Sequence, residues 1–244
     1  MQIYQNILDA IADGERLLAV LIDPDKFSLS NTGHFMEKVN RSIATHVFVG
    51  GSTGDGNATH ILVDKIRNET DLPVVLFPGD VTQISDRADA ILFLSLISGR
   101  NPEYLIGKHV ESVSKLRGAE LEIIPTGYVL IEGGKSTAVE TVTATQPLQN
   151  SDIQKISDTA KAGEFLGMKL MYLEAGSGAE NCVSEDIIKS VKHDLKIPLI
   201  VGGGIKTKAQ IEKAYDSGAD MIVIGTAFEE DATFLDELKY NNGR

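Results

Sequence analysis

Residues 198–204 read PLIVGGG, and residues 221–227 read MIVIGTA. Each stretch is a short, almost continuous apolar run that ends in glycine. Such runs of four to eight residues are typical of a strand buried on both faces. Between them, residues 206–217 (KTKAQIEKAYDS) space Ile211 and Ala214 as one face of a helix and stop before Gly218, a residue typical of helix C-termini. The stretch therefore predicts a strand, a helix and a parallel strand.

The same unit recurs along the chain. Ser184 followed by Glu185 and Asp186, for example, is typical of a helix start. Eight apolar runs alternating with helical stretches in 244 residues predict a single (β/α)₈ TIM barrel domain over residues 1–244. The six other runs are Leu17–Asp23, His46–Ser52, Pro73–Gly79, Ala90–Ile97, Glu122–Val129 and Met168–Glu174.

Two connections depart from a regular barrel. Only the ten residues DVTQISDRAD, at 80–89, separate the third run from the fourth. That is too short for a full helix and two loops, so we predict a missing or reduced third helix and an open flank. Roughly 38 residues, from Leu130 to Gly167, separate the fifth run from the sixth and open with EGGK at 132–135. An insertion on this side of a barrel is typical of an active-site loop; an inert surface excursion is the alternative.

Composition excludes several classes of protein. The formal net charge is −12, which argues against a nucleic-acid partner. Cys182 is the only cysteine, so an intrachain disulfide is impossible and a reducing, cytoplasmic location fits. Met1–Glu15 lacks the features of a signal peptide, and no run reaches the roughly 20 apolar residues of a membrane span. We therefore expect any membrane contact to be peripheral.

Glycines follow the last two predicted strands. Gly203 and Gly204 end the seventh run, and Gly225 and Thr226 end the eighth. Backbone N–H groups without side chains can converge on an oxyanion, and these two loops frequently form the phosphate site of a barrel. Tight turns alone would explain the glycines of one loop. Their presence on both neighbouring strands favours a phosphate site.

Polar residues at other strand ends extend this site. Asp23 offers a hard oxygen ligand suited to Mg²⁺, and Ser52 on the neighbouring strand offers a hydroxyl. Asp25 fits a capping turn better. Lys26 could neutralise phosphate or simply be exposed.

Glu174 ends an otherwise apolar strand, where burial would raise its pKa towards the range of a general base. A structural ion pair is the alternative. Tyr172 lies two residues earlier and faces the same side, where it could hold a substrate hydroxyl or simply pack.

Together these segments resemble the geranylgeranylglyceryl phosphate synthase family over nearly the whole chain. YLEAGSG followed by GGGI and GT is the specific combination, since GGGI or GT alone also fits other phosphate-binding barrels. The matching segments are LIDPDK (21–26), VGGST (49–53), LFPG (76–79), SLISGRNP (95–102), IPTGY (124–128), YLEAGSG (172–178) and VGGGI (201–205).

The resemblance implies a Mg²⁺-dependent prenyltransferase that is a homo-oligomer, a dimer or a hexamer. Such an enzyme joins the C3 hydroxyl of sn-glycerol 1-phosphate to an allylic prenyl diphosphate, geranylgeranyl diphosphate in the family's name, and releases diphosphate. It also implies roles by position: Asp23 and Ser52 as metal ligands, Glu174 and Tyr172 as catalytic residues, and Tyr172, Glu174, Gly176, Ser177, Gly178, Gly203, Gly204, Gly225 and Thr226 as substrate-binding residues.

Several alternatives stay open at this point. Some family members carry lysine where this chain has Leu21, so a different branch and a longer donor, such as a heptaprenyl chain, are possible. The open flank near Phe77, Pro78 and Leu94 is the candidate prenyl groove, although ordinary core packing would also suit these residues. A phosphosugar isomerase-type barrel and a non-catalytic phosphometabolite-binding barrel share the phosphate site.

Overall fold

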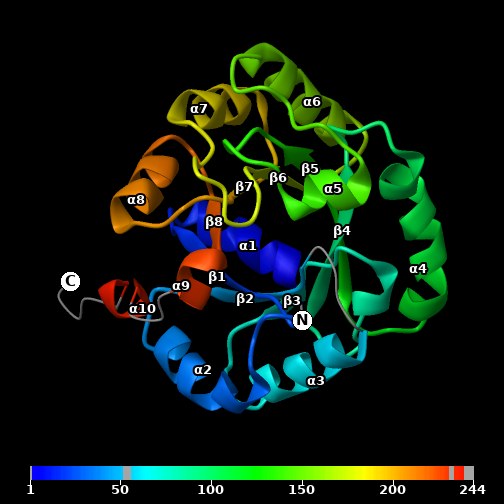
Figure 1. Ribbon diagram of the computed structural model, residues 1–244, viewed down its shortest axis with the longest axis vertical. Coiled ribbons are helices and arrows are strands. Elements are labelled where there is room, and N and C mark those ends of the chain that lie inside the picture. The colour runs from blue at the N-terminus through cyan, green and yellow to red at the C-terminus, as the bar shows by residue number, and fades with distance from the viewer. Residues whose placement is uncertain (1, 52–55, 231–233, 239–244) are drawn as a thin grey trace.

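The computed structural model describes residues 2–51, 56–230 and 234–238. Its eight strands form one closed, parallel barrel in which the neighbours follow chain order, as Figure 1 shows. This arrangement confirms the predicted TIM barrel. The strands are β1 (Leu17–Ile22), β2 (His46–Val49), β3 (Val74–Leu76), β4 (Ala90–Leu96), β5 (Glu122–Leu130), β6 (Leu170–Glu174), β7 (Leu199–Gly202) and β8 (Met221–Ile224).

Helices surround the barrel (Figure 1). The main helices are α1 (Ile3–Ala12), α2 (Thr32–Asn40), α3 (Gly56–Arg67), α4 (Lys108–Leu116), α5 (Ala138–Thr143), α6 (Ile153–Phe165), α7 (Glu185–Asp194), α8 (Lys208–Asp216), α9 (Thr226–Glu230) and α10 (Phe234–Glu237). Shorter turns are η1 (Leu29–Asn31), η2 (Val81–Gln83) and η3 (Glu103–Gly107).

Both faces of the strands are buried, which explains the continuous apolar runs. In β1, Leu17 and Ala19 belong to the cluster inside the barrel, whereas Leu18 and Val20 pack against the helices. Helix α1 adds Ile3 to the inner cluster, and the Tyr4 N–H donates to the Glu122 carboxylate at the start of β5 (3.1 Å). The open site is therefore at the opposite end, where the strands terminate.

Local capping explains two helix starts. The Ser184 hydroxyl accepts from the Ile187 N–H, as the predicted start of α7 requires. Helix α8 begins later than the sequence pattern suggested, because Thr207 and Gln210 form a reciprocal capping box. It ends before Gly218, whose φ of +111° suits glycine.

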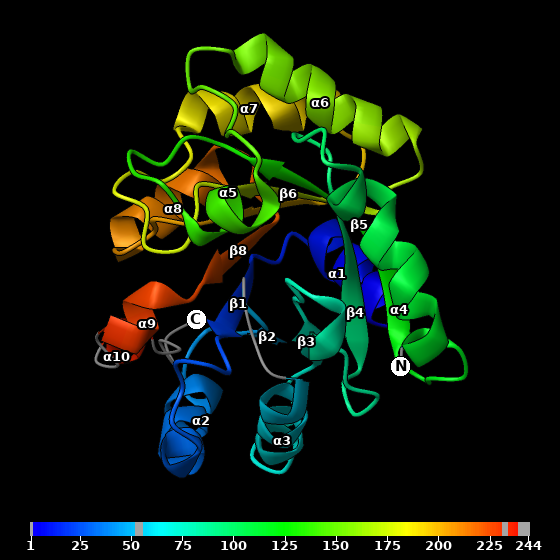
Figure 2. The same ribbon diagram turned by 45° about the vertical axis from the view of Figure 1, so that its right-hand side comes forward.

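The third barrel helix is reduced to one turn. Only η2 connects β3 to β4, which confirms the predicted irregularity. The turn is held by the Asp80 carboxylate, which accepts from the Thr82 N–H (3.0 Å). Figure 2 shows this short connection beside α3 and the edge of α4.

The long connection after β5 contains two elements rather than one insertion. Helix α6 is the ordinary barrel helix, so the true excursion is the segment before it. There Ile131 forms a β-bridge with Leu148. Helix α5, which lies between these two residues in the chain, is placed over the mouth of the barrel (Figure 1). This position supports the predicted active-site loop.

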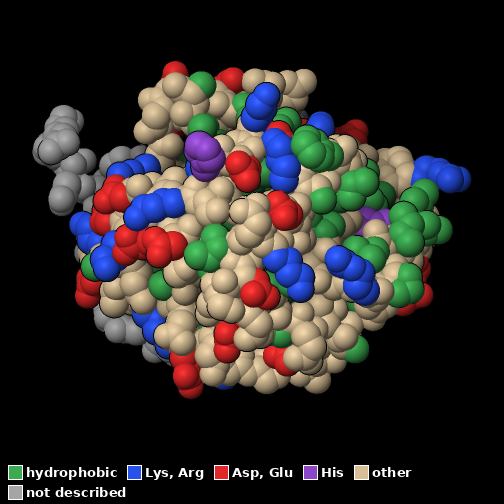
Figure 3. Space-filling view, turned by 90° about the horizontal axis from the view of Figure 1, so that it is seen from above, with side chains coloured by type: hydrophobic (Ala, Val, Ile, Leu, Met, Phe, Trp, Pro, Cys, Tyr) green, Lys and Arg blue, Asp and Glu red, His purple; other side chains and the backbone are tan. Residues whose placement is uncertain are grey.

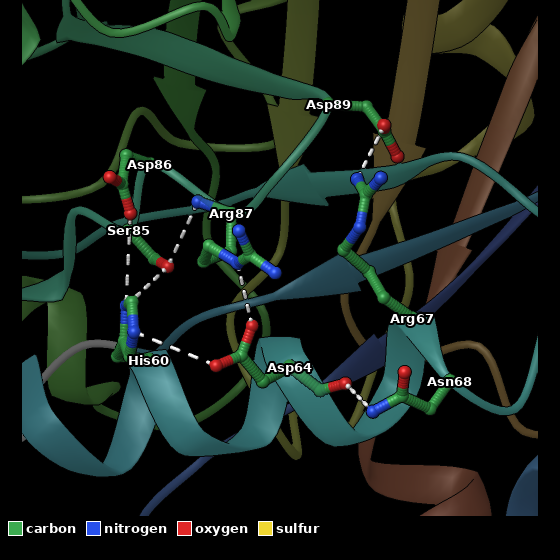
Figure 4. Close-up of polar contacts among 8 residues, drawn as sticks. All are labelled: His60, Asp64, Arg67, Asn68, Ser85, Asp86, Arg87 and Asp89. Atoms are coloured by element: carbon green, nitrogen blue, oxygen red, sulfur yellow. Dashed lines mark hydrogen bonds and ion pairs between the residues drawn. The ribbon is translucent and has the colours of Figure 1, made fainter.

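Side-chain contacts hold the segment that replaces the third barrel helix (residues 80–89) against α3. Figure 4 shows His60 and Asp64 of α3 facing Ser85 and Arg87. The His60 Nδ1 lies 3.0 Å from the Ser85 hydroxyl, and the Arg87 Nε donates to Asp64 over 3.0 Å. Because Asp64 and Arg87 are 42% and 61% exposed, their ion pair contributes only about 0–1 kcal/mol.

Two aspartates that each precede a strand, Asp89 and Asp220, have the same structural role. Asp89 precedes β4 and accepts from the Val74 N–H at the start of β3 (2.8 Å), while Arg67 at the end of α3 donates to it (Figure 4). Asp220 precedes β8 and accepts from the Leu199 N–H of β7 (2.7 Å). Lys192 near the end of α7 completes the second set. Each aspartate therefore ties a strand start to the helix before it.

We expect Asp220→Ala to lower the free energy of unfolding by about 1–3 kcal/mol, because the buried N–H of Leu199 loses its acceptor. Asp216→Ala is the matched control, since that carboxylate is 67% exposed and pairs only with Arg16 at the surface. Urea unfolding followed by circular dichroism measures both. Equal effects of the two substitutions would contradict the assigned role.

Candidate functional site

A cavity of about 1120 Å³, partly open to solvent, lies at the carboxyl ends of the strands. It brings together residues that the sequence predicted from β1, β6, β7 and β8. Gly176 is next to it, and Ser52 lies outside the described residues. The predicted residues that line the cavity are Asp23, Tyr172, Glu174, Ser177, Gly178, Gly203, Gly204, Gly225 and Thr226.

Glu174 is the central group. It is 6% exposed at the end of β6 and forms no ion pair within the described part of the chain. Its Oε1 accepts from the Gly176 N–H over 2.6 Å. Burial raises the pKa of Glu174 to about 7, and this hydrogen bond only partly opposes the rise. The alternative of a structural ion pair is therefore not supported, and the carboxylate is suited to accept a proton near neutral pH.

Tyr172 stands beside this carboxylate. Its ring stacks on Tyr128 with centroids 5.4 Å apart, and Phe77 packs at 5.2 Å. The Tyr172 hydroxyl is close enough to Glu174 to oppose the rise in its pKa, but it is buried without a hydrogen bond of normal geometry to any described residue. Burial, followed by the charge of Glu174, raises the pKa of Tyr172 well above its ordinary value. The Tyr172 hydroxyl therefore keeps its proton and can donate a hydrogen bond to a bound ligand.

The glycines of β7 leave room for these side chains. A Cβ at Gly202 would lie 2.1 Å from the Tyr172 hydroxyl, and one at Gly203 would lie 2.2 Å from Glu174 Oε1. Gly203 also has a φ of +82°, which favours glycine. The GGG sequence was predicted as a phosphate cradle, and its glycines are also needed to leave room for the buried Glu174 carboxylate. Gly204 and Gly225, predicted for the same cradle, also line the cavity.

The turn after β6 meets the end of β8. The Ser177 hydroxyl lies 3.1 Å from the Thr226 hydroxyl, so the two predicted binding loops contact each other. Lys206, which follows the β7 glycines, also lines the cavity. Together the hydroxyls, the backbone N–H groups and the lysine form a site suited to a phosphate group.

Asp23 follows β1, the strand that pairs with β8. Its carboxylate accepts from the Asp25 N–H (3.0 Å) and pairs with Lys26 (3.1 Å). A Cβ at Gly51 would lie 2.8 Å from this carboxylate, so glycine gives it space. The described residues contain no group of three or more potential metal-binding side chains. A single carboxylate nonetheless fits Mg²⁺, which often takes one or two protein ligands together with substrate phosphates.

An apolar groove adjoins the polar cavity. The space within it, open solvent included, is about 850 Å³. It opens where the third helix is reduced, and its lining includes the predicted Phe77, Pro78 and Leu94. Lys108 of α4 pairs with Asp80, and both line the groove. His109 also lines it, and burial lowers the pKa of this imidazole.

The two cavities adjoin each other. Gly51, Phe77, Tyr128 and Val139 line both. Val139 belongs to α5, so the excursion after β5 covers the junction. Val139 and Lys206 were not predicted, because a valine in a short helix and a lysine after a strand carry no local signal.

Comparisons with known proteins agree with this geometry. The PcrB family model matches residues 12–242. A geranylgeranylglyceryl phosphate synthase from Zunongwangia profunda is 56% identical over 91% of this chain and 97% of that protein. The synthase of the same name from Flavobacterium johnsoniae is 51% identical over 96% of both chains.

A solved structure shares the whole fold. The crystal structure of (S)-3-O-geranylgeranylglyceryl phosphate synthase from Thermoplasma acidophilum in complex with sn-glycerol-1-phosphate matches with a TM-score of 0.91 and 33% identity. The match covers 98% of this chain and 96% of that one. Family model, sequence relatives and fold agree over nearly the full length, and the chain belongs to the PcrB family.

Proposed function

We propose that this protein is a prenyltransferase that forms an ether bond between the C3 hydroxyl of sn-glycerol 1-phosphate and geranylgeranyl diphosphate. The observation that carries the proposal is that a polar, glycine-lined cavity adjoins an apolar groove and contains one buried carboxylate. A phosphorylated acceptor fits the first compartment and a prenyl chain fits the second. The names of the relatives and the ligand of the Thermoplasma structure support both substrates.

The residues of this chain account for the proton and the charge. Glu174 accepts the proton of the C3 hydroxyl, whose oxygen supplies the electron pair of the new C–O bond. As that bond forms at the first carbon of the prenyl chain, the allylic C–O bond breaks and its electron pair leaves with diphosphate. Tyr172 donates a hydrogen bond that orients the acceptor. The apolar groove keeps water away from the cation-like prenyl group.

We propose Asp23 as the protein's ligand for Mg²⁺; Ser52, outside the described residues, remains the second proposed ligand. Bound there, Mg²⁺ would neutralise charge that develops on the leaving diphosphate. Asp23 lines the polar cavity near Gly51, which also lines the groove. The carboxylate is therefore near the junction at which the diphosphate of a bound donor would lie.

The rival functions fit less well. A phosphosugar isomerase would need an acid–base partner on β5, but Thr126 is fully buried and donates to the Ile124 carbonyl of its own strand. A non-catalytic binding barrel leaves the unpaired Glu174 unexplained. A heptaprenyl donor is not favoured, since the two relatives are named for the geranylgeranyl group.

We further propose that the protein is a cytoplasmic homo-oligomer, either a dimer or a hexamer. Helix α4 and the turn before it expose Ile106, Val110 and Val113, whose spacing places them on one helix face. Figure 3 shows hydrophobic side chains gathered on the side of the molecule where α4 lies. No helix of the described chain is both long and apolar enough to cross a membrane, and any membrane contact is proposed to be peripheral.

The transfer reaction is tested with labelled sn-glycerol 1-phosphate, Mg²⁺ and prenyl diphosphates of increasing length. We expect a labelled ether with geranylgeranyl diphosphate, and about 10²–10⁴-fold less with Glu174→Gln, the range typical of a lost general base. EDTA and Asp23→Asn should each reduce turnover while sn-glycerol 1-phosphate still binds. Full turnover in EDTA would contradict the role of Mg²⁺. Binding of the acceptor without transfer from any donor would leave only a phosphate-binding barrel.

The pH dependence of stability tests the state of Glu174 without turnover. Its pKa is about 7 in the fold and ordinarily 4.5, so ionising it in place costs about 3 kcal/mol. The contribution of protonated Glu174 to the free energy of unfolding is fully present below pH 4.5 and is lost as the pH rises through 7. Glu174→Gln does not ionise and keeps its free energy of unfolding over this range. The free energy of unfolding of the variant, relative to wild type, should therefore rise by about 3 kcal/mol between pH 4 and pH 8. Parallel urea-unfolding curves for the two proteins over this range would exclude the raised pKa.

Light scattering tests the oligomer. We expect a mass that corresponds to two or six chains of 26.3 kDa, reduced by Val110→Lys because a charge would enter the apolar face. Lys155→Ala on exposed α6 is the control. A monomeric wild-type protein would contradict this proposal and leave the proposed reaction untouched.

A further inference from the structure

Lys135 is an exposed residue whose ammonium group lies close to Gly178, a residue that lines the polar cavity. Its Nζ lies 3.4 Å from the point that a Cβ at Gly178 would occupy, and the Thr226 methyl lies 3.9 Å from the same point. Ser177 meets Thr226 through their hydroxyls. An ammonium group thus lies beside the turn after β6 and the end of β8, although Lys135 itself comes from the excursion after β5.

This ammonium group is not neutralised by a carboxylate. Within the described ranges of the chain, Lys135 forms no ion pair. Glu180, whose Oε2 lies 3.3 Å from the Cβ position of Gly134, is close to the same loop, yet it forms no ion pair with Lys135. In a protein with a net charge of −12, an unpaired cation beside a glycine-lined cavity produces a local positive potential.

The backbone before Lys135 is fixed in place. The Gly133 carbonyl accepts from the Glu180 N–H (2.9 Å) and the Asn181 N–H (3.0 Å). A Cβ at Gly133 would lie 2.2 Å from the Ala175 carbonyl oxygen, so only glycine allows this close contact. The loop that carries Lys135 is therefore held against the turn that follows Glu174, which lowers the entropy cost of placing the ammonium group there.

We propose that Lys135 binds the phosphate group of the acceptor and makes the site select a phosphorylated alcohol over an unphosphorylated one. The identity of the acceptor rests on the proposed function; the anion site itself does not. A charge-assisted hydrogen bond from ammonium to phosphate is stronger than one between neutral groups, and glycerol offers no such acceptor. Lysine acts here as a mobile point charge, complementary to the fixed N–H groups of Gly204 and Gly225.

Calorimetric titration of the full-length protein with sn-glycerol 1-phosphate, and separately with inorganic phosphate, measures this role without any prenyl donor. We expect Lys135→Met to weaken both affinities by roughly ten- to a hundredfold. Lys135→Arg should restore binding to within a few-fold, because the charge is kept. Lys155→Ala, an exposed lysine on α6, should leave both affinities unchanged. In turnover, Lys135→Met should raise the KM for the acceptor with a smaller change in kcat.

Wild-type affinity of Lys135→Met for both anions would overturn the inference. Equally weak binding by Lys135→Arg and Lys135→Met would also overturn it, since a loop disturbed by either substitution would then be the cause. Unchanged circular dichroism in Lys135→Met and a second variant, Lys135→Gln, excludes misfolding. Absence of prenyl transfer by the wild type, with anion binding still dependent on Lys135, would refute the proposed function and support the inference.

Discussion

A carboxylate buried without a cation is the constraint on which the rest of the site depends. Glu174 receives one hydrogen bond from the Gly176 N–H, and this does not compensate its burial. The surrounding backbone must approach closely, which is why Gly202 and Gly203 lack side chains where Tyr172 and Glu174 lie. The raised pKa is a consequence of the fold rather than of a neighbouring charge. The barrel thus carries a destabilising group at the position where the proposed reaction uses a base, and costly residues of this kind often lie at functional sites.

The reduction of the third barrel helix to one turn has two consequences. Its loss removes the cover from one side of the barrel and leaves the apolar groove between η2 and α4. The same loss deprives the β3–β4 connection of helix packing. Polar contacts replace part of it: Asp89 ties the start of β3 to Arg67, and Lys108 reaches Asp80 from the other side. Because these contacts are partly exposed, they hold the segment without filling the groove.

Sequence patterns were sufficient for the fold because the barrel's burial is encoded locally. Each strand is buried on both faces, so its apolar run stands out, and the short spacer at 80–89 left no room for a helix. The site residues at strand ends were predictable for the same reason, since parallel strands bring their carboxyl ends together. The sequence could not show that Gly203, predicted for a phosphate cradle, also makes room for Glu174, because that contact joins two strands. Lys135 and Val139 were equally hidden, since only the path of the excursion over the mouth places them.

The distribution of charge makes an acidic chain compatible with the two anionic substrates proposed for it. The net charge of −12 repels anions at long range, but that repulsion is screened beyond about 10 Å at ordinary ionic strength. Within that distance the phosphate cavity meets Lys206 from the β7 loop and the nearby Lys135 from the excursion after β5, together with N–H groups free of side chains. Lys26 is already paired with Asp23 after β1, the strand that pairs with β8. The mouth therefore offers two kinds of group: lysines and N–H groups suited to a phosphate, and a carboxylate that favours a cation. In the proposed reaction, this difference directs the acceptor's phosphate to the lysines and the donor's diphosphate to a cation at Asp23.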